Sequence, residues 1–551
     1  MLSSVQFSYF ERILGFVKLD FGSNYFKMII MQHIFNTEKK LLIIFIFIGL
    51  IWGVLNFDIL LNQGGDNGRY IMLGRSILEG KFMREVNTPA EELHKQYPPL
   101  FPLVLSFIMF IFGRENIFMM KVFSLIFYLL SILLFYLNLN FYFKKEKILK
   151  IFLVLIFIFA KNIVGWSSLV LSESLFIFLI LSTLFFFNRF QQTNKILDYI
   201  IFLIFCTLSV FTRGNGVIVF LSTLIFLFLT KRNKLIPITF IFLILSQIWG
   251  FYLFLKTGHT STYFQQVFYK NIYFPDAGKI SFYNLIERIY FNTIIYFTKI
   301  IPGTFLGNVN SQLYYLPLKI IPIITFLGGL ILCIRKKIYF ETSLIIINLI
   351  VLILWPVYFS TERFFAPLFS LYLIISSFSI VWLTERKKSF LLLLYYIFLT
   401  YSILINFTIN FVDVPKKVYA LKNTDFNFRN DNKFRSELGV KLLFQTAIWA
   451  KDNTPKNCVI MSMKPELIYL YSDRKTVIFP YTDNDFVVIN YMKNNRVDYI
   501  IFEDNPDQKR LTNLTINRFI LKHKNAFSMV YTDLEVPLYS LLKVNKEVLI
   551  K

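Results

Sequence analysis

The sequence holds little of the chemistry that metal-dependent, redox or disulfide-stabilised proteins need. Its 551 residues include three cysteines, Cys206, Cys333 and Cys458, which allow one disulfide at most. Its four histidines are scattered and form no H-x-x-x-H motif. No histidine cluster or Asp-x-Asp pair accompanies the candidate site residues described below. We therefore expect no cofactor, with a divalent metal left open as the alternative.

Charged residues are also scarce, at 17% of the chain, and their signs are unequal. Lysine and arginine number 58 against 34 acidic residues, which gives a formal net charge of +24. Such an excess can indicate nucleic-acid binding, but no soluble segment here has a groove pattern of basic and aromatic residues. We therefore expect no nucleic-acid partner. The basic residues instead form short clusters between apolar runs, as in the cytoplasmic loops of membrane proteins.

Apolar sequence is abundant, since 56% of the residues are hydrophobic and 19% are aromatic, more than soluble domains contain. A run of about 20 apolar residues can cross a bilayer as a helix. Runs near this length occupy residues 41–61, 118–142, 148–165, 169–190, 196–212, 216–230, 235–256, 316–334, 338–360, 364–384 and 389–411. This pattern predicts a polytopic α-helical membrane protein with about eleven transmembrane helices.

Two weaker apolar stretches, 98–113 and 289–305, make thirteen crossings the alternative. The first is short and begins with prolines, and the second is interrupted by polar residues. With eleven crossings and a cytoplasmic N-terminus, the positive-inside rule is satisfied by all of the basic clusters, at residues 38–40, 144–147, 231–234, 335–337 and 385–388. Counting 98–113 as a span would place 144–147 outside. We therefore interpret 98–113 as a helix lying on the outer leaflet.

The composition divides the chain into three parts. These are a cytoplasmic segment at 1–40, a transmembrane domain at 41–411 with outer loops 62–117 and 257–315, and a soluble domain outside the membrane at 412–551. The last part alternates helix and strand patterns, which predicts an α/β domain. Its expected elements are helices 433–452, 465–472, 484–494 and 508–524 and strands 457–463, 475–480, 497–503, 527–532 and 537–543. It has no Gly-rich phosphate loop, which favours a recognition or lid domain over a nucleotide site.

A polar segment at residues 62–99 directly follows the first span and contains the first candidate site residue. Asp66 precedes an amphipathic helix pattern that runs from Tyr70 to Gly80. One interpretation of Asp66 is a helix N-cap, a position that aspartate favours. The other is a general base at the mouth of a membrane-embedded cavity. Asp58, at the outer end of the first span, is a competing carboxylate.

Three further ionisable residues, Glu173, Arg213 and Arg363, map to the outer ends of spans. An ionisable group at membrane level is costly unless it faces protein or water, so we interpret Glu173 as functional, with a helix-start carboxylate as the alternative. Outer arginines run against the positive-inside trend, and a guanidinium binds phosphate bidentately, which makes Arg213 and Arg363 candidate phosphate ligands. Their alternative role is to meet lipid headgroups. Weaker candidates of the same kind are Lys95, Lys121 and Lys161.

Together these residues resemble the GT-C superfamily of membrane glycosyltransferases, most closely the protein O-mannosyltransferases and the lipid A aminoarabinose transferase. In that branch the first outer loop carries an acidic residue, a helix from Tyr to Gly, and a Pro-Pro-Leu corner. A later span begins with Ser-Glu, and one of the last spans carries Arg-Tyr/Phe-x-x-Pro. The matching positions here are Asp66, Tyr70 with Gly80, Tyr97-Pro98-Pro99-Leu100, Ser172-Glu173 and Arg363-Phe364-Phe365-Ala366-Pro367. The resemblance covers about residues 41–411.

The resemblance implies an inverting sugar transfer from a polyprenyl-phosphate donor to a glycan, lipid or protein acceptor. The reaction would occur on the outer face of the cytoplasmic (inner) membrane. Asp66 would deprotonate the acceptor hydroxyl, and Glu173 would orient the acceptor or share the role of base. Arg363 would neutralise the departing lipid phosphate. The other residues of the predicted substrate-binding set are Arg213, Tyr97 and Lys121.

Two other functions stay open at this point. A transporter or flippase of a lipid-linked or small polar substrate would also be a polytopic membrane protein, but transporters place ionisable groups near the middle of the membrane. Here Asp66, Glu173 and Arg363 are expected at the outer ends of spans, which favours an enzyme. The third hypothesis is a non-catalytic assembly subunit that binds lipid through its arginines.

Overall fold

The computed structural model describes residues 24–57, 61, 66–258, 262–272, 277–307, 316–422, 435–504 and 511–550. The chain divides into two compact units, Met1–Phe47 and Ile48–Lys551. The candidate Asp58 and parts of the expected outer loops 62–117 and 257–315 lie outside the described residues. All contacts discussed below lie within the second unit.

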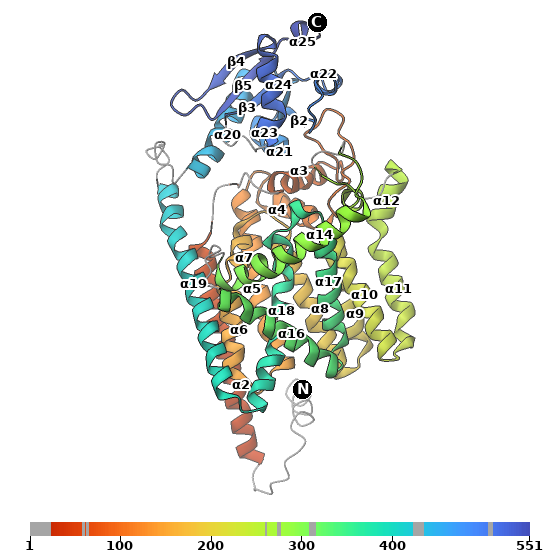
Figure 1. Ribbon diagram of the computed structural model, residues 1–551, viewed down its shortest axis with the longest axis vertical. Helices are drawn as coiled ribbons and strands as arrows, with labels where there is room; N and C mark the ends of the chain where they lie inside the picture. Colours follow the sequence, from red (N-terminus) through yellow and green to blue (C-terminus); the bar gives the residue numbers. More distant parts are fainter. Residues whose placement is uncertain are drawn as a thin grey trace. The chain divides into compact units, whose positions relative to one another are not determined.

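Each of the eleven apolar segments contains a helix or a pair of helices (Figure 1). They are α2 (Asn24–Leu55), α5 (Ile117–Tyr142), α6 (Lys147–Phe159) with α7 (Lys161–Val164), α8 (Glu173–Thr193), α9 (Ile196–Thr212), α10 (Val217–Leu229), α11 (Ile236–Ser246) with α12 (Ile248–Thr257), α16 (Leu316–Arg335), α17 (Tyr339–Leu354), α18 (Glu362–Glu385) and α19 (Ser389–Lys422). A helix satisfies its backbone hydrogen bonds internally, which lipid requires of an apolar segment.

Length and composition separate these helices into groups. Among the described residues, α5, α8, α16, α18 and α19 are the five helices long and apolar enough to cross a membrane. Two bent pairs, α6 with α7 (52°) and α11 with α12 (41°), raise the number to seven if each pair is one span. The helices α9, α10 and α17 are apolar but no longer than 17 residues. The protein is therefore a multi-pass membrane protein, and its eleven crossings stay a prediction.

The two weaker apolar stretches are also helical. Residues 98–113 contain α4 (Leu100–Phe112), and residues 289–305 fall in α14 (Phe282–Ile295), the π-helical turn η5 (Tyr296–Ile300) and α15 (Ile301–Leu306). At 1.5 Å per residue, the 13 residues of α4 extend about 20 Å, which is short of a hydrocarbon core of roughly 30 Å. However, α10, one of the eleven predicted spans, also has 13 residues, so the interfacial placement of 98–113 stays a prediction.

The C-terminal part forms the predicted α/β domain. One five-stranded sheet has the order β2-β1-β3-β5-β4, in which β2, β1 and β3 are parallel and β5 is antiparallel to both β3 and β4. Its strands are β1 (Val459–Ser462), β2 (Lys475–Ile478), β3 (Tyr499–Glu503), β4 (Phe527–Thr532) and β5 (Tyr539–Val544). Its helices are α20 (Arg435–Asn453), α21 (Pro465–Ser472), α22 (Asp485–Asn494), α23 (Leu511–Leu514), α24 (Ile516–Lys522) and α25 (Lys546–Ile550). The expected helix at 508–524 is thus two short helices.

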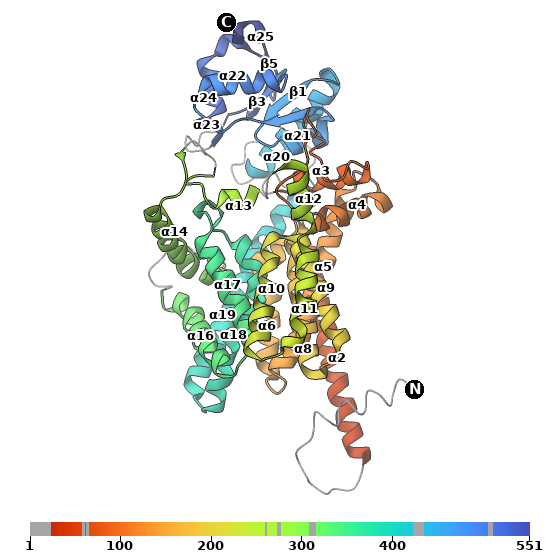
Figure 2. The same ribbon diagram turned by 90° about the vertical axis from the view of Figure 1, so that its right-hand side faces the viewer.

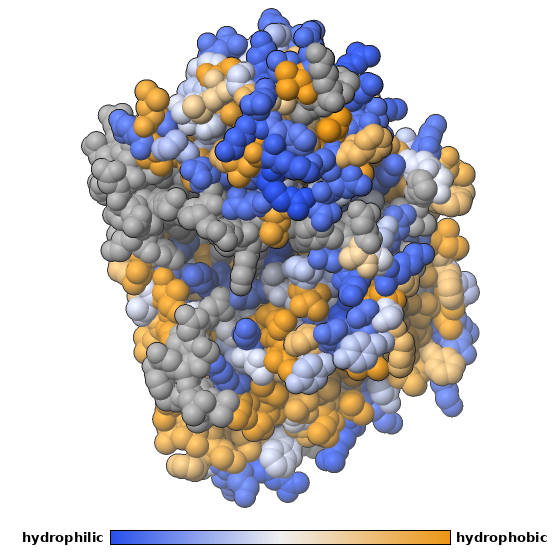
Figure 3. Space-filling view, turned by 45° about the horizontal axis from the view of Figure 1, so that its top comes forward, coloured by the Kyte–Doolittle hydropathy of each residue, from blue (hydrophilic) through white to orange (hydrophobic). Residues whose placement is uncertain are grey.

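Side chains of this sheet alternate between two apolar cores, one on each face. Ile460 and Ile501 pack with side chains of α20, whereas Met461 and Ile500 pack with side chains of α22 and α24. Alternation with period two fills both faces, because successive strand residues point to opposite sides. On the face seen in Figure 3, hydrophilic side chains gather on this domain and hydrophobic ones over the helices below it.

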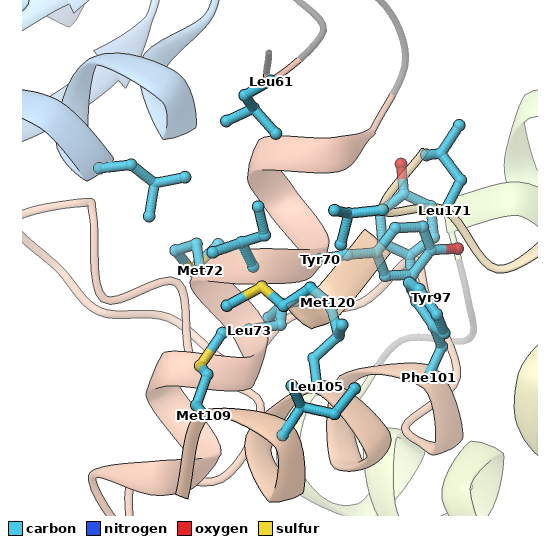
Figure 4. Packing of buried hydrophobic residues seen from close by; sticks show 14 of the residues in the cluster. Leu61, Tyr70, Met72, Leu73, Tyr97, Phe101, Leu105, Met109, Met120 and Leu171 are labelled. Atoms are coloured by element: carbon cyan, nitrogen blue, oxygen red, sulfur yellow. The ribbon is translucent and has the colours of Figure 1, made fainter. Parts of the chain in front are cut away.

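The α/β domain packs on α3 (Asn67–Leu78), the helix that follows the first span (Figure 2). A cluster of buried side chains joins α3 to α4, to α5 and to Leu467 and Leu470 of α21. Figure 4 shows Leu73 of α3 within this cluster, beside Leu105 of α4. The missing side chain of Gly68 permits the close approach, because a Cβ there would lie 2.8 Å from Leu467 Cδ2. The domain therefore rests on the helix that begins after Asp66.

Candidate functional site

Four charged side chains that are far apart in the sequence meet at helix ends. Asp66 directly precedes α3, Glu173 begins α8, Arg213 follows α9, and Arg363 lies in the first turn of α18. Arg363 Nη1 lies 2.8 Å from Asp66 Oδ2, and Arg363 Nε donates to Glu173 Oε1. Arg213 Nη1 lies 2.7 Å from the same Glu173 oxygen. The structure thus joins four of the predicted site residues in one ion-pair network.

Asp66 occupies the N-cap position of α3, but its side chain makes no capping hydrogen bond. The carboxylate is instead turned towards Arg363 and also hydrogen-bonds to Tyr97. A capping side chain typically stabilises a helix by about 1 kcal/mol. Asp66 does not contribute this stabilisation to α3, because its carboxylate contacts Arg363 and Tyr97 instead. The N-cap interpretation is therefore right for its position and wrong for its side chain. With 28% of that side chain exposed, the carboxylate is accessible to a substrate.

The surrounding charges keep Asp66 ionised. Burial alone would raise the pKa of its carboxyl, but the Arg363 guanidinium, the hydrogen bonds from Tyr97 and Arg363, and the charge of Arg69 bring the pKa below its ordinary value of 3.8. Asp66 is therefore a carboxylate at neutral pH. Its affinity for a proton stays low while Arg363 is paired with it.

Glu173 is fully buried at the start of α8, where the helix dipole favours a negative charge. Its Oε1 accepts hydrogen bonds from Arg213 and Arg363, which orients both guanidinium groups. Its Oε2 is buried and has no hydrogen-bond partner among the described residues. A buried charged oxygen without a partner is costly, so Oε2 is well placed to accept a hydrogen bond from a bound hydroxyl.

Tyr97 joins the network from the Pro-Pro corner. Its ring stacks on Tyr70 at a centroid distance of 4.7 Å, and its side chain hydrogen-bonds to Asp66. The Tyr70 hydroxyl lies 3.0 Å from Ser172 Oγ, next to Glu173 in the chain. Figure 4 shows the two rings packed against each other. The resemblance assigned Tyr97 to substrate binding, and the structure gives it a contact that supports the Asp66 carboxylate.

Two residues that were not predicted, His94 and Glu85, hold Tyr97 in place. His94 is buried, its Nε2 accepts the backbone N–H of Tyr97 at 2.9 Å, and its Nδ1 lies 3.0 Å from Glu85 Oε1. Because Nε2 is an acceptor, the ring is neutral and carries its proton on Nδ1. Burial lowers the pKa of His94 below its ordinary value of 6.5, and the opposing effect of Glu85 is smaller. An isolated histidine has no spacing signal in the sequence, so contacts alone identify it.

We expect His94 to make the protein less stable as the pH falls below about 6.5. Its pKa is lower in the folded protein than in the unfolded chain, so the unfolded chain binds more protons in this range and stability rises with pH. His94→Gln supplies an acceptor for the Tyr97 N–H and does not titrate. The decrease in Tm between about pH 7.5 and pH 5.5 should therefore be smaller in this variant than in the wild type. His523→Gln, in the α/β domain, is the control, and an unchanged decrease in His94→Gln would contradict the prediction.

The α/β domain reaches the Asp66 helix through charged residues that no local sequence pattern singles out. Arg69, in the first turn of α3, pairs with Glu466 of α21 at 2.5 Å and donates to Gln96 at 2.9 Å. Lys475 of β2 pairs with Glu91 at 2.7 Å. Both pairs join residues nearly 400 positions apart, so only the folded chain brings them together. The first pair ties the start of α3, next to Asp66, to the C-terminal domain, and the second ties the loop that follows α3.

The predicted lysines have separate surroundings. Lys121 is fully buried in the second turn of α5, next in the chain to Met120 of the cluster in Figure 4, and its part in the site stays a prediction. Lys95 pairs with Glu92 at 3.8 Å, and the backbone N–H of Lys161 donates to Asn406. Within the described ranges, no group of three or more His, Cys, Asp and Glu side chains is arranged to hold a metal ion.

Comparison with known proteins begins with the sequence. A profile of the dolichyl-phosphate-mannose-protein mannosyltransferase family matches residues 96–254. This region includes Tyr97, Glu173 and Arg213, whereas Asp66 and Arg363 fall outside it. No curated protein matches the sequence.

Solved structures match nearly the whole chain. ArnT from Cupriavidus metallidurans, solved with undecaprenyl phosphate, is 12% identical, with a TM-score of 0.55 over 91% of this chain and 97% of that one. The oligosaccharyltransferase of Archaeoglobus fulgidus tethered to an acceptor peptide is 13% identical, with a TM-score of 0.54 over 92% and 74%. The oligosaccharyltransferase AglB from the same organism, solved with an inhibitory peptide and a dolichol-phosphate, is 12% identical. Its TM-score is 0.54 over 92% of this chain and 74% of that one. These matches confirm the predicted fold.

Proposed function

We propose that this protein, which has the fold of GT-C membrane glycosyltransferases, moves a sugar from a polyprenyl-phosphate donor to a hydroxyl of a glycan, lipid or protein. The observation that carries this proposal is the network of Asp66, Arg363, Glu173 and Arg213, in which the accessible Asp66 carboxylate pairs with Arg363 and the buried Glu173 joins Arg363 to Arg213. The match to a mannosyltransferase profile supports sugar transfer. The likeness to proteins solved with undecaprenyl phosphate and dolichol-phosphate supports a lipid-phosphate donor.

In the proposed reaction the acceptor oxygen attacks the anomeric carbon as the bond from that carbon to the phosphate oxygen breaks, with inversion at the carbon. Asp66 takes the proton of the attacking hydroxyl, which typically contributes about 10²–10⁴-fold to the rate. Glu173 Oε2 accepts a hydrogen bond from a hydroxyl of the acceptor or sugar. Arg363 and Arg213 stabilise the negative charge that develops on the departing lipid phosphate. No cofactor enters this scheme.

Arg363 also explains how a carboxylate with a low pKa can act as a base. Its guanidinium is shared between Asp66 and Glu173. A bound phosphate competes for the same guanidinium and brings its own negative charge, and both effects raise the proton affinity of Asp66. Donor binding would therefore activate the base at the moment an acceptor needs it.

We also propose that the site lies on the outer face of the inner membrane. The basic turns at 335–337 and 385–388 follow the ends of α16 and α18, whereas Arg363 lies at the opposite end of α18. Under the positive-inside rule these turns belong in the cytoplasm, which puts Arg363 and the α/β domain outside. The acceptor would then be an envelope glycan, lipid or protein.

The test is sugar transfer by the purified protein from a set of labelled polyprenyl-phosphate sugars. Membranes of an envelope preparation would supply the acceptors. Consumption of one donor with release of the lipid phosphate, together with label in an acceptor, would support the proposal and name the sugar. Donor that crosses proteoliposomes unchanged would favour a flippase. Tight lipid binding without turnover would favour the assembly subunit.

We expect Glu466→Gln to lower the turnover rate several-fold while leaving the KM for the donor nearly unchanged. The variant removes the partner of Arg69 in the first turn of α3 and loosens Asp66 without touching the phosphate-binding arginines. Arg69→Gln also removes the hydrogen bond to Gln96 and a positive charge near Asp66, so it should lose at least as much, and the double variant should be no worse than Arg69→Gln alone. Kinetics of all three variants check this. Asp485→Asn, which alters an ion pair elsewhere in the domain, is the control, and additive losses would contradict the prediction.

A further inference from the structure

A groove of about 480 Å³ runs between α16, α18 and α19. All three helices are apolar and long enough to cross a membrane. Ten of the fourteen residues that line the groove are aliphatic or aromatic. Ile324, Ile331, Leu391 and Leu394 line it and are between 44% and 63% exposed. Side chains of this kind at membrane level contact lipid or another helix, so the groove needs an occupant.

The groove exists because α16 carries no side chains where it meets α18. At Gly328 a Cβ would lie 2.7 Å from Ser379 Oγ, and at Gly329 it would collide with the Ile375 carbonyl. The two helices therefore approach closely, and Ser379 Oγ donates to the Thr325 carbonyl at 2.8 Å. This contact forms the floor, and the longer side chains on either side form the walls. The hollow is thus fixed by the backbone.

The end of the groove away from the Asp66 network is strongly basic. Arg335 lines the groove together with Trp382, and Arg386 lies 6.0 Å from the centre of the Trp382 ring. Six exposed basic side chains lie at or just after the ends of α16 and α18, where Glu385 is an acidic neighbour. They are Arg335, Lys336, Lys337, Arg386, Lys387 and Lys388. The positive-inside rule accounts for basic turns. Arg335 belongs to one of these turns and also lines the groove, so its positive charge lies beside whatever fills the hollow.

We propose that this groove binds one anionic phospholipid, with its phosphate near Arg335 and its acyl chain along α16 and α19. Basic pockets between membrane helices are suited to anionic headgroups, and Trp382 lies at the level where aromatic side chains meet the membrane interface. A protein helix seated here would have to place acidic residues against both basic turns. The site is separate from the donor site, since Arg363 and Arg335 lie near opposite ends of the helices.

The proposal is tested by native mass spectrometry and Tm measurements on the full chain, with phosphatidylglycerol and phosphatidylcholine of identical chains as probes. Wild type should retain phosphatidylglycerol several-fold better and gain the larger Tm increase from it. Arg335→Gln/Lys336→Gln/Lys388→Gln should lose this preference. The control Lys144→Gln/Lys145→Gln/Lys147→Gln, which removes three charges from the turn between α5 and α6, should keep it.

A second pair of variants tests the groove with its charges intact. Ile331→Trp fills the hollow and should reduce binding of both lipids. Ile334→Trp, on the same helix, just as exposed but not in the groove wall, should not. Equal binding of the two lipids by wild type, or equal effects of the matched variants, would overturn the proposal. A dimer that Ile331→Trp dissociates would also overturn it, in favour of a second copy of the chain.

Discussion

Asp66→Asn is expected to abolish sugar transfer while leaving the protein folded. Asparagine cannot accept the proton of the acceptor hydroxyl, so the rate should fall by at least the ~10²–10⁴-fold that a general base contributes. Since the Asp66 side chain makes no capping hydrogen bond, this substitution removes no cap, and the start of α3 should be preserved. Arg363 keeps its contact with Glu173 in this variant, which leaves the phosphate-binding groups in place.

The measurement is donor consumption by the purified variant, beside its Tm and its affinity for a polyprenyl phosphate. Asp473→Asn is a matched control, because Asp473 is half-exposed, ends α21 in the left-handed conformation that asparagine tolerates, and lies outside the network. Unchanged transfer by Asp66→Asn would sink its assignment as the base. Lost transfer with a much lower Tm would show only a folding defect.

Most of the fold could be predicted, because the local spacing of apolar residues indicates which segments form helices and which form strands. Apolar runs of spanning length gave the helices, and alternating short patterns gave the sheet, with 465–472 and 527–532 predicted at their observed bounds. The strand order could not be predicted, because it depends on which strands pair across long connections. Helix bends, such as the 52° change of direction after α6, also depend on packing rather than composition.

The site residues also fall into those that the sequence predicts and those that only the structure identifies. Asp66, Glu173 and Arg363 stand at helix ends, where an isolated charge next to an apolar run is visible in the sequence. Residues that only position another site residue carry no such signal in the sequence. His94 is a single histidine in a polar loop, and Glu466 is one acidic residue in a soluble domain. The role of each depends on a partner that folding places beside it, Tyr97 for His94 and Arg69 for Glu466.

Arg363→Ala should weaken donor binding more than acceptor binding and should also lower the turnover rate. A hydrogen bond to a charged group contributes about 1.5–3 kcal/mol, so the Kd for a polyprenyl-phosphate sugar should rise about tenfold or more. Losing a donor that stabilises the developing charge costs about 10²–10³ in rate. Arg363→Lys keeps the charge without the bidentate fork and should fall between wild type and Arg363→Ala. Titration calorimetry with the donor and steady-state kinetics would measure both effects.

A simple loss of affinity in Arg363→Ala has two explanations, because Arg363 also holds Asp66 and Glu173 together. Without it, two carboxylates face the incoming phosphate and repel it. The double variant Arg363→Ala/Glu173→Gln removes the buried charge of Glu173. If donor affinity stays low in this variant, Arg363 itself binds the phosphate, whereas recovery of affinity would assign the loss to repulsion. Arg189→Ala, which breaks an ion pair with Asp198 remote from the network, is the control for the loss of an arginine.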